Sequence, residues 1–562
     1  MASQVRSATR SRRLPRILAA IVFLGVASAA GGFLGPKMFA VSNANSKELR
    51  EYSDILTAAR TWYADELPSE KLVFASIQGM LGTLDPHTTF LEPEEYSSMQ
   101  EKQRGSFYGL GIIISKRNGK ITVITPVEGS PADRLGIRAG DVIDKVEGQP
   151  IDDLPVDAVV KKLKGPKGTQ VHITIVRPGL DEPLQMTVTR AEIPTNSVSY
   201  AFLLEPEVGY IRLKDFTHTS GPEVADAWDK LNKQGMKRLV FDLRGNPGGL
   251  LDQAIAVSDF FLQKGDKVVS TKGRNGSSES SFTAPGKNNR TRIPVVVLLN
   301  RGSASASEIV AGAVQDHDRG LIVGQTSWGK GLVQSVFTLS DGAGLALTSA
   351  KYYTPTGRCI QRDYHDVLEY LTADADGEDG EEEAGGATPD TTEGRETYRT
   401  DAGRTVYGGG GITPDVIVKT EQLSRFAATL YARGLFFEFA VSYRAKHPFV
   451  PRDLKITDAV REEFFTFVEG RNLGFDQPTR SLYESEKDHG VIDRAIREEL
   501  LTAVYGREAG HRVTLEGDVQ LRKALTLFPE AERLASLKRN PELAGLVKGK
   551  DGKVEGRAEA TR

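Results

Sequence analysis

Cysteine is almost absent from this chain of 562 residues, which has only Cys359. A single cysteine excludes internal disulfide bonds, cysteine-built zinc fingers and iron–sulfur clusters. The eight histidines are scattered, and no two have the i, i+4 spacing of a helical zinc site. A net charge of −3 argues against a dedicated nucleic-acid binder. The composition therefore predicts no metal site and no nucleic-acid partner.

The N-terminus has the pattern of an export signal. The first 16 residues contain five arginines and no acidic residue, and residues 17–34 carry no charge. A basic stretch before an apolar one keeps its positive end on the cytoplasmic side. The 18 apolar residues are just enough to span a bilayer. Cleavage near residues 27–29 is the alternative. For residues 1–45 we favour a membrane anchor over a signal peptide. Either places the body outside the cytoplasm, anchored or secreted, on the periplasmic side of a bacterial inner membrane.

The rest of the chain alternates between helical and strand patterns, and its length predicts roughly three or four domains. Residues 46–96 and 421–562 have apolar residues at helical spacing, and the second range ends in a charged tail. Residues 97–190 contain short β-branched runs between Gly, Pro and Asn-Gly turns, which is typical of strands. Residues 191–420 alternate strand and helix signals, which predicts an α/β domain.

An acidic insertion interrupts the α/β region between residues 363 and 407. Within it, residues 366–396 contain twelve acidic residues and one arginine. A segment with so few apolar residues cannot bury a core of its own. We expect a solvated insertion; a functional acidic segment is the alternative.

Three serines alternate with alanines directly after the apolar run 295–299: Ser303, Ser305 and Ser307. Small residues at a turn from strand to helix would expose a hydroxyl and leave backbone N–H groups free to bind an oxyanion. Ser305 and Glu308 also have the spacing of a helix capping box. That structural explanation accounts for one serine and not for the crowding of small residues around it.

Residues 324–331 (GQTSWGKG) nearly match a phosphate-binding loop. Gly331 stands where a hydroxyl would have to hold magnesium, so nucleotide binding is not expected. What remains is Lys330 beside Trp328 in a glycine-lined turn. Burial lowers the pKa of a lysine and can make it a general base. A plain surface lysine is the alternative.

Residues 242–249 (DLRGNPGG) end another apolar strand with two glycines. Their N–H groups could bind an anion, or the glycines could simply form a tight turn. A Ser-His-Asp triad is disfavoured, because His317 follows Ser305 on one predicted helix at a distance of about 18 Å. His218 stays open as an alternative base.

Together these segments resemble the carboxyl-terminal processing (tail-specific) protease family, and the resemblance runs over residues 50–420. It includes residues 242–250 and 303–308. The other matching segments are GML at 79–81, LDPH at 84–87, FYGLGI at 107–112, GKGLVQ at 329–334, YYTPTG at 352–357 and GITPD at 411–415.

The resemblance implies a Ser–Lys endopeptidase with a multidomain α/β fold. A mostly-β PDZ domain at 97–190 would precede a crotonase/ClpP-like protease core. Ser305 would be the nucleophile, with Ser303 and Ser307 as alternatives. Lys330 would be the base and Gln334 would orient it.

The resemblance also implies how substrate is held. The oxyanion would be bound by the Ala306 N–H and by the N–H of one glycine of the pair, for which Gly249 is favoured over Gly248. No metal, nucleotide or cofactor would be needed. The expected partners are protein or peptide C-terminal tails, a membrane and a second copy of the chain. The alternative is a non-catalytic PDZ scaffold. The presence of Ser305, Lys330 and Gln334 together argues against it. The residues expected to grip the tail are Tyr108, Gly109, Leu110 and Gly111.

Overall fold

The structure is a computed structural model. It describes residues 46–274, 279–288, 290, 293–364, 394–469, 471, 473–475, 477–484 and 489–537. The predicted anchor or signal peptide and most of the acidic insertion lie outside these ranges. No helix within them is long and apolar enough to cross a membrane. The chain forms two compact units, Met1–Leu84 and Asp85–Arg562.

The described part of the first unit contains two helices, as the sequence predicts: α2 (Ser46–Trp62) and α3 (Ser69–Gly82). Leu81 is buried, but seven large apolar side chains are exposed. These exposed residues are Leu49, Tyr52, Ile55, Trp62, Tyr63, Met80 and Leu84. The two predicted helices are present, and part of their apolar surface is exposed.

The second unit begins with the strand β1 (Thr89–Leu91) and the helix α4 (Pro93–Arg104). An antiparallel sheet with the order β3-β4-β5-β7-β8 follows, in which β6 (Gln149–Pro150) pairs with β5. Two short helices, α5 (Pro131–Arg134) and α6 (Val156–Leu163), complete this part. The sheet strands are β3 (Ile112–Arg117), β4 (Lys120–Pro126), β5 (Val142–Val146), β7 (Gln170–Val176) and β8 (Leu184–Thr189).

Among the described residues, six strands form the central sheet in the order β10-β11-β12-β15-β16-β21. β10 is antiparallel to β11, and the other pairs are parallel. This confirms the predicted α/β alternation. The strands are β10 (Val198–Glu205), β11 (Val208–Leu213), β12 (Arg238–Asp242), β15 (Val295–Leu299), β16 (Leu321–Gly324) and β21 (Val416–Ile417).

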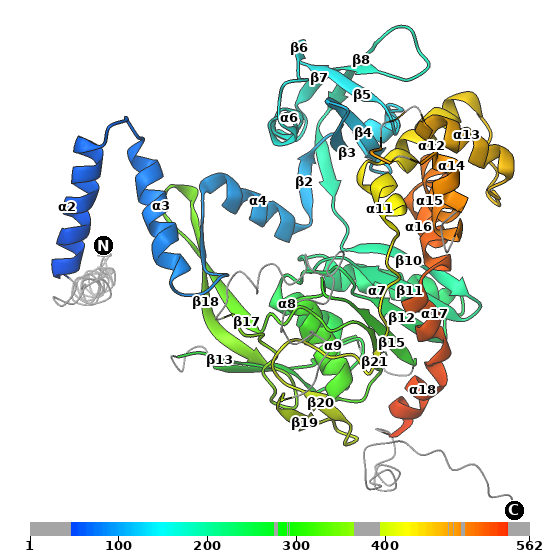
Figure 1. Cartoon of the computed structure of the whole chain (residues 1–562). Coiled ribbons are helices and arrows are strands. Elements are labelled where there is room, and N and C mark those ends of the chain that lie inside the picture. Colours follow the sequence, from blue (N-terminus) through cyan, green and yellow to red (C-terminus); the bar gives the residue numbers. More distant parts are fainter. Residues whose placement is uncertain are drawn as a thin grey trace, which may run out of the picture. The chain divides into compact units, whose positions relative to one another are not determined.

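Helices cover both faces of this sheet (Figure 1). Val295, Val297 and Leu299 of β15 pack on the side of α7, α8 and α9, whereas Val296 and Leu298 pack on the side of α17 and α18. This alternation follows from the two-residue period of a strand, and it explains why all five residues are apolar. The helices are α7 (Ser220–Lys233), α8 (Leu251–Ser258), α9 (Ala306–Asp316), α17 (Val519–Thr526) and α18 (Phe528–Leu537).

The C-terminal helices contribute to two separate hydrophobic cores. The helices from α11 to α15 share an apolar core of their own, in which α13 buries Val460, Phe464 and Val468 as its periodicity predicts. α17 and α18 instead complete the core of the central sheet, so residue 420 does not separate two independent cores. The helices before α17 are α11 (Arg425–Ala432), α12 (Leu435–Lys446), α13 (Asp458–Glu469), α14 (Thr479–Glu484), α15 (His489–Tyr505) and α16 (Arg507–Glu516).

A second antiparallel sheet is formed by segments that come before the strands of the central sheet or between them in the sequence. The sequence analysis did not predict this sheet. β18 is its longest strand and pairs with β1, β13 and β17, while β14 pairs with β13. The strands added here are β13 (Lys267–Lys272), β14 (Ser280–Thr283), β17 (Leu332–Thr338) and β18 (Gly344–Tyr353).

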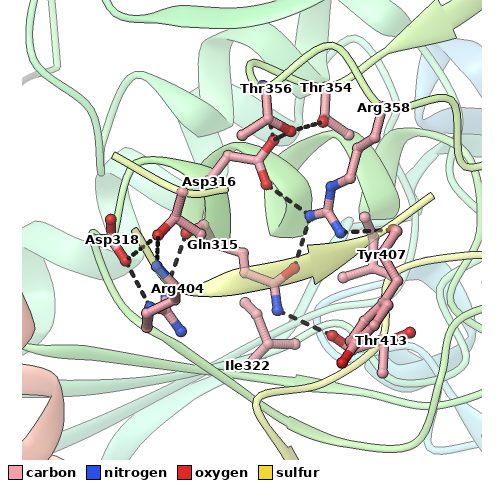
Figure 2. A network of polar contacts seen from close by, with 12 residues as sticks. Gln315, Asp316, Asp318, Ile322, Thr354, Thr356, Arg358, Arg404, Tyr407 and Thr413 are labelled. Atoms are coloured by element: carbon pink, nitrogen blue, oxygen red, sulfur yellow. Dashed lines mark hydrogen bonds and ion pairs between the residues drawn. The ribbon is translucent and has the colours of Figure 1, made fainter. Parts of the chain in front are cut away.

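Part of the predicted solvated insertion is folded, which corrects that expectation. Residues 394–407 contain a hairpin of β19 (Thr397–Arg399) and β20 (Thr405–Tyr407). Figure 2 shows Arg404, next to β20, reaching Asp318 just beyond the end of α9. The fully buried Arg358 donates hydrogen bonds of 2.7 Å to Gln315 Oε1 and to Asp316 Oδ1. Paired charges of this kind can be buried, so these side chains fix the C-terminal end of α9.

The packing of α18 on the central sheet generates a stability prediction. Phe528 is 2% exposed against the sheet, so Phe528→Ala should destabilise the protein by about 3–5 kcal/mol. Phe449→Ala is the matched control, because this side chain is 80% exposed and should change stability little. Chemical denaturation followed by tryptophan fluorescence measures both. Equal unfolding midpoints for the two variants would contradict the shared core.

Candidate active site

Ser305 lies at the turn between β15 and α9, where it is the N-cap residue of the helix. Its backbone has φ 53° and ψ −111°, a conformation that is costly for a residue with a side chain. Ser303 and Ser307 are fully buried and donate hydrogen bonds of 2.9 Å to the carbonyl oxygens of Leu243 and Asn246. Ser305 is partly exposed. Among the three serines, Ser305 has the placement that a nucleophile needs.

The predicted link between Ser305 and Glu308 is present through the backbone of Ser305. The Ser305 N–H donates to Glu308 Oε2 at 2.7 Å, and the Glu308 N–H donates to the Ser305 carbonyl oxygen at 2.9 Å. These bonds start α9 and stabilise the strained residue. The structural explanation of the serine–glutamate spacing is therefore compatible with a chemical role for the hydroxyl.

Glu308 has a larger role than its sequence position suggested. Its carboxylate is fully buried and also accepts hydrogen bonds from the Ser327 hydroxyl at 2.6 Å, the Gly329 N–H at 2.7 Å and the Lys330 N–H at 3.0 Å. Burial raises the pKa of Glu308, and the four donors act in the opposite direction. The carboxylate thus joins Ser305 to the loop that contains Lys330. Sequence reasoning treated Glu308 only as a cap and missed this.

Lys330 lies in the turn between β16 and β17. A strand follows this turn, not a helix, so a phosphate-binding loop is ruled out by the local fold as well as by Gly331. Lys330 Nζ donates to Gln334 Oε1 at 3.0 Å. Burial lowers the pKa of Lys330 below its ordinary value of 10.5, although Glu308 and Asp85 oppose the shift.

Gln334 has a defined orientation. Its Nε2 donates to the His87 carbonyl oxygen at 2.6 Å, which leaves Oε1 directed at Lys330 Nζ. A second side chain missed in the sequence, Tyr352, donates its hydroxyl to the Ser305 carbonyl oxygen at 3.2 Å and also to the carbonyl oxygen of Lys330. Ser305 and Lys330 are 25 residues apart in the sequence, yet their backbones bind the same two side chains.

The glycine pair lies against Ser305. A Cβ added to Gly248 would be 2.8 Å from Ser305 Cβ and 2.8 Å from the Ala306 nitrogen, so a side chain there would collide with the turn. Gly248 donates its N–H to Asn246 Oδ1 at 2.8 Å. Within the described ranges, the N–H groups of Gly249 and Ala306 donate no hydrogen bond. The N–H groups of Gly249 and Ala306 are therefore both available to an oxyanion. The Gly248 N–H is not available, because it is already bonded to Asn246.

The histidines occupy other places. His317 is the C-cap of α9, at the opposite end from Ser305, and its ring nitrogens bond to Asp401 and the Lys267 carbonyl oxygen at 2.8 Å. The alternative base His218 is exposed, and no described carboxylate is hydrogen-bonded to its ring. The described residues also contain no group of three or more metal-ligating side chains.

The predicted tail-binding residues are divided between a strand and a turn. Tyr108 and Gly109 belong to β2 (Ser106–Gly109), which pairs with β9 (Ala191–Pro194). Leu110 and Gly111 follow, and their carbonyl oxygens accept bonds from the Ala132 N–H and the Val127 N–H. The N–H groups of Leu110 and Gly111 donate no hydrogen bond in the part of the chain described here. β3, which comes next, is an edge strand of its sheet.

Three family profiles match parts of the chain. They are Peptidase family S41 at residues 207–367, PDZ domain at 122–177 and Probable PDZ-protease, C-terminal helical domain, at 426–489. They confirm the predicted order of a PDZ domain, a protease domain and a helical region.

Two relatives and one solved structure are similar to the chain. The carboxy-terminal-processing protease of Bartonella bacilliformis is 41% identical over 319 residues, covering 56% of this chain and 73% of the relative. The carboxyl-terminal-processing protease of Synechocystis is 40% identical over 303 residues, covering 53% and 70%. The solved photosystem II D1 C-terminal processing protease is 32% identical, covering 55% and 89%, with a TM-score of 0.32. The extent of identity with the two relatives confirms the resemblance seen in the motifs: the chain belongs to the carboxy-terminal processing protease family and is a serine protease.

Proposed function

We propose that this chain is an extracytoplasmic serine endopeptidase that binds protein C-termini and cleaves near them through a dyad of Ser305 and Lys330. The observation that carries the proposal is the shared binding of both residues by Glu308: the carboxylate accepts the Ser305 N–H at 2.7 Å and the Lys330 N–H at 3.0 Å. It supports a site in which a partly exposed serine and a half-buried lysine face one substrate.

The chemistry follows from the protonation of Lys330. Neutral Nζ removes the proton of the Ser305 hydroxyl, and the oxygen attacks the peptide carbonyl. The resulting oxyanion accepts hydrogen bonds from the N–H groups of Gly249 and Ala306. Collapse breaks the C–N bond, and the amine leaves with the proton from Lys330. A water molecule, deprotonated by Lys330, then hydrolyses the acyl-enzyme and restores the serine.

The partner of Lys330 suits a base. A carboxylate hydrogen-bonded to Nζ would favour the ammonium form and raise the pKa of the lysine. Gln334 binds Nζ with a neutral amide oxygen, and its orientation is set by the His87 carbonyl oxygen. This arrangement orients Nζ without adding a full negative charge next to it.

Substrate capture is assigned to the PDZ domain. The N–H groups of Leu110 and Gly111 would bind the terminal carboxylate, and the tail would add as a strand along the free edge of β3. Tyr108 and Gly109 would act by holding this turn, because β2 pairs them with β9.

Location and assembly are parts of the same proposal. The arginines and the apolar run in residues 1–34 support an anchor or export signal on the periplasmic side of a membrane. The exposed apolar side chains of α2 and α3 support a second copy of the chain as a partner, since paired amphipathic helices would cover one another.

The first test is replacement of the dyad. Ser305→Ala and Lys330→Arg should each abolish cleavage of an unstructured peptide with a free C-terminus, while the thermal midpoint stays close to that of the parent. A guanidinium keeps its proton and cannot act as the base. Lys351→Arg, at an exposed position of β18, should keep full activity. Substantial turnover by Lys330→Arg would contradict the assignment of Ser305 and Lys330 as the catalytic dyad.

The second test uses pH. Because the base must be neutral and burial lowers the pKa of Lys330, kcat/KM should rise with pH and reach its plateau below the ordinary lysine value of 10.5. Gln334→Glu should move this rise to higher pH, since a carboxylate at Nζ favours the ammonium form. His87 cannot produce the same rise at neutral pH, because burial and Lys330 lower its pKa to about 4. Coincident profiles for parent and Gln334→Glu would exclude Lys330 as the titrating group.

The third test addresses tail recognition in the full chain with Ser305→Ala, which binds without cleaving. A peptide with an apolar C-terminal residue should bind roughly ten- to a hundredfold more tightly than the same peptide amidated at its end. The charged carboxylate strengthens hydrogen bonds from the Leu110 and Gly111 N–H groups, and amidation removes that charge. Fluorescence anisotropy measures both affinities. Equal affinities would remove tail capture from the proposal and leave the dyad intact.

A further inference from the structure

Arg244 begins the loop that leads from β12 to Gly249, and it is bound to the strand end. Its backbone N–H and its Nε donate to Asp242 Oδ1 at 2.9 and 3.0 Å, and a terminal nitrogen donates to Oδ2 at 2.6 Å. Asp242 is fully buried and Arg244 nearly so. Arg244 lies five residues before Gly249, so its position sets where the oxyanion loop leaves the sheet.

The other side of this guanidinium is held by α17, more than 270 residues later in the sequence. Its remaining terminal nitrogen bonds to Asp518 Oδ2 at 2.7 Å and to Gln520 Oε1 at 3.0 Å. Asp518 Oδ1 caps α17 by accepting the Leu521 N–H at 2.9 Å. Gln520 is fully buried and donates to the Val418 carbonyl oxygen at 2.8 Å. The C-terminal helix is thus bonded directly to the start of the oxyanion loop.

A second contact from the C-terminal helices reaches the same strand end. Tyr210 donates its hydroxyl to Asp242 Oδ2 at 2.8 Å, and His511 Nε2 of α16 lies 3.2 Å from that hydroxyl. The His511 ring stacks on Tyr200 with centroids 3.9 Å apart. Burial lowers the pKa of His511 to about 4, so the ring is neutral at neutral pH and Nε2–H can donate to Tyr210.

The loop beyond Arg244 is tied at several other points. The Gly245 N–H donates to Asn300 Oδ1 at 2.8 Å, and Asn246 Nδ2 donates to the Leu213 carbonyl oxygen at 2.9 Å. Phe216 binds on both sides of Gly249: its N–H donates to Gly248, and its carbonyl oxygen accepts from Leu250. Arg244 and these bonds together set the path of the short loop to Gly249, so Arg244 is the anchor at its start.

We propose that Asp518 and Gln520 are positioning residues of the active site, which hold Arg244 so that the loop presents the Gly249 N–H to the oxyanion at Ser305. This inference rests on the proposed role of Gly249. It gives the C-terminal helices a part in catalysis beyond covering the sheet. A displacement of catalytic groups by about 1 Å can cost a hundredfold in rate, so a modest shift of this loop should be measurable.

The experiment separates the cap function of Asp518 from its contact with Arg244 in the full chain. In Asp518→Ser the hydroxyl still caps α17, but the side chain is uncharged and too short to hold Arg244. We expect kcat to fall by about ten- to a hundredfold, with KM and the thermal midpoint nearly unchanged. In Asp518→Glu the carboxylate is kept and the cap is weakened. This variant should be less stable yet retain a kcat close to that of the parent.

Two further variants keep the test decisive. Gln520→Leu removes the second acceptor of Arg244 and should lower kcat in the same direction. Arg512→Ala is the control, because Arg512 of α16 lies 3.7 Å from the Phe202 ring centroid and donates to the Leu203 carbonyl oxygen, and neither contact involves Arg244. It should lower stability and leave kcat unchanged.

A peptide aldehyde provides a readout of the oxyanion site itself. Its adduct with Ser305 places a negative oxygen where the Gly249 and Ala306 N–H groups act. Its affinity should fall in Asp518→Ser by the same factor as kcat. If Asp518→Ser and Gln520→Leu both keep the kcat and the aldehyde affinity of the parent, the inference is overturned. Both residues would then have only a structural role. Failure of the proposed function gives a different result: either Ser305→Ala keeps full activity or the parent is inactive. In that case the inference fails as well.

Discussion

The buried carboxylate of Glu308 organises the candidate active site. Removed from water, it needs donors for both oxygens, and it obtains them from Ser305, Ser327, Gly329 and Lys330. These donors come from two segments, so satisfying the carboxylate brings the turn with Ser305 and the loop with Lys330 together. Glu308 binds the backbone N–H of Lys330 and not Nζ. The loop is therefore fixed while the amine keeps a neutral partner and a lowered pKa.

The strain at Ser305 depends on the same group. A backbone at φ 53° and ψ −111° costs about 1–3 kcal/mol and persists only where its surroundings hold it. The Ser305 N–H donates to Glu308, its carbonyl oxygen accepts from Tyr352, and a Cβ added to Gly248 would lie only 2.8 Å from its Cβ. The small residues around Ser305 are required by this close approach. A helix that merely needed a cap would not need them.

Sequence patterns predicted what is local and missed what is distant. The strand β15 has the bounds of the apolar run at residues 295–299, because that run is short and has clear ends. Glu308 was assigned to a cap, since nothing in the sequence indicates which loop will supply its other donors. The helical spacing of residues 421–562 predicted helices, but it did not indicate that α17 and α18 pack on the central sheet. Both omissions concern contacts between residues far apart in the chain.

The two-sided burial of β15 connects these observations. Its odd-numbered residues pack toward α9, which carries Ser305 at its N-cap, and its even-numbered residues pack toward α17 and α18. Such a strand cannot shift without disturbing both layers, because interiors are close-packed. The end of the neighbouring strand β12 is held by Arg244 between Asp242 and Asp518. The turn with Ser305 and the turn with Gly249 thus leave adjacent strands that are each fixed from both faces. Donors that are already in place stabilise an oxyanion without having to move during the reaction. In the proposed mechanism, this double anchoring holds the Gly249 and Ala306 N–H groups in place.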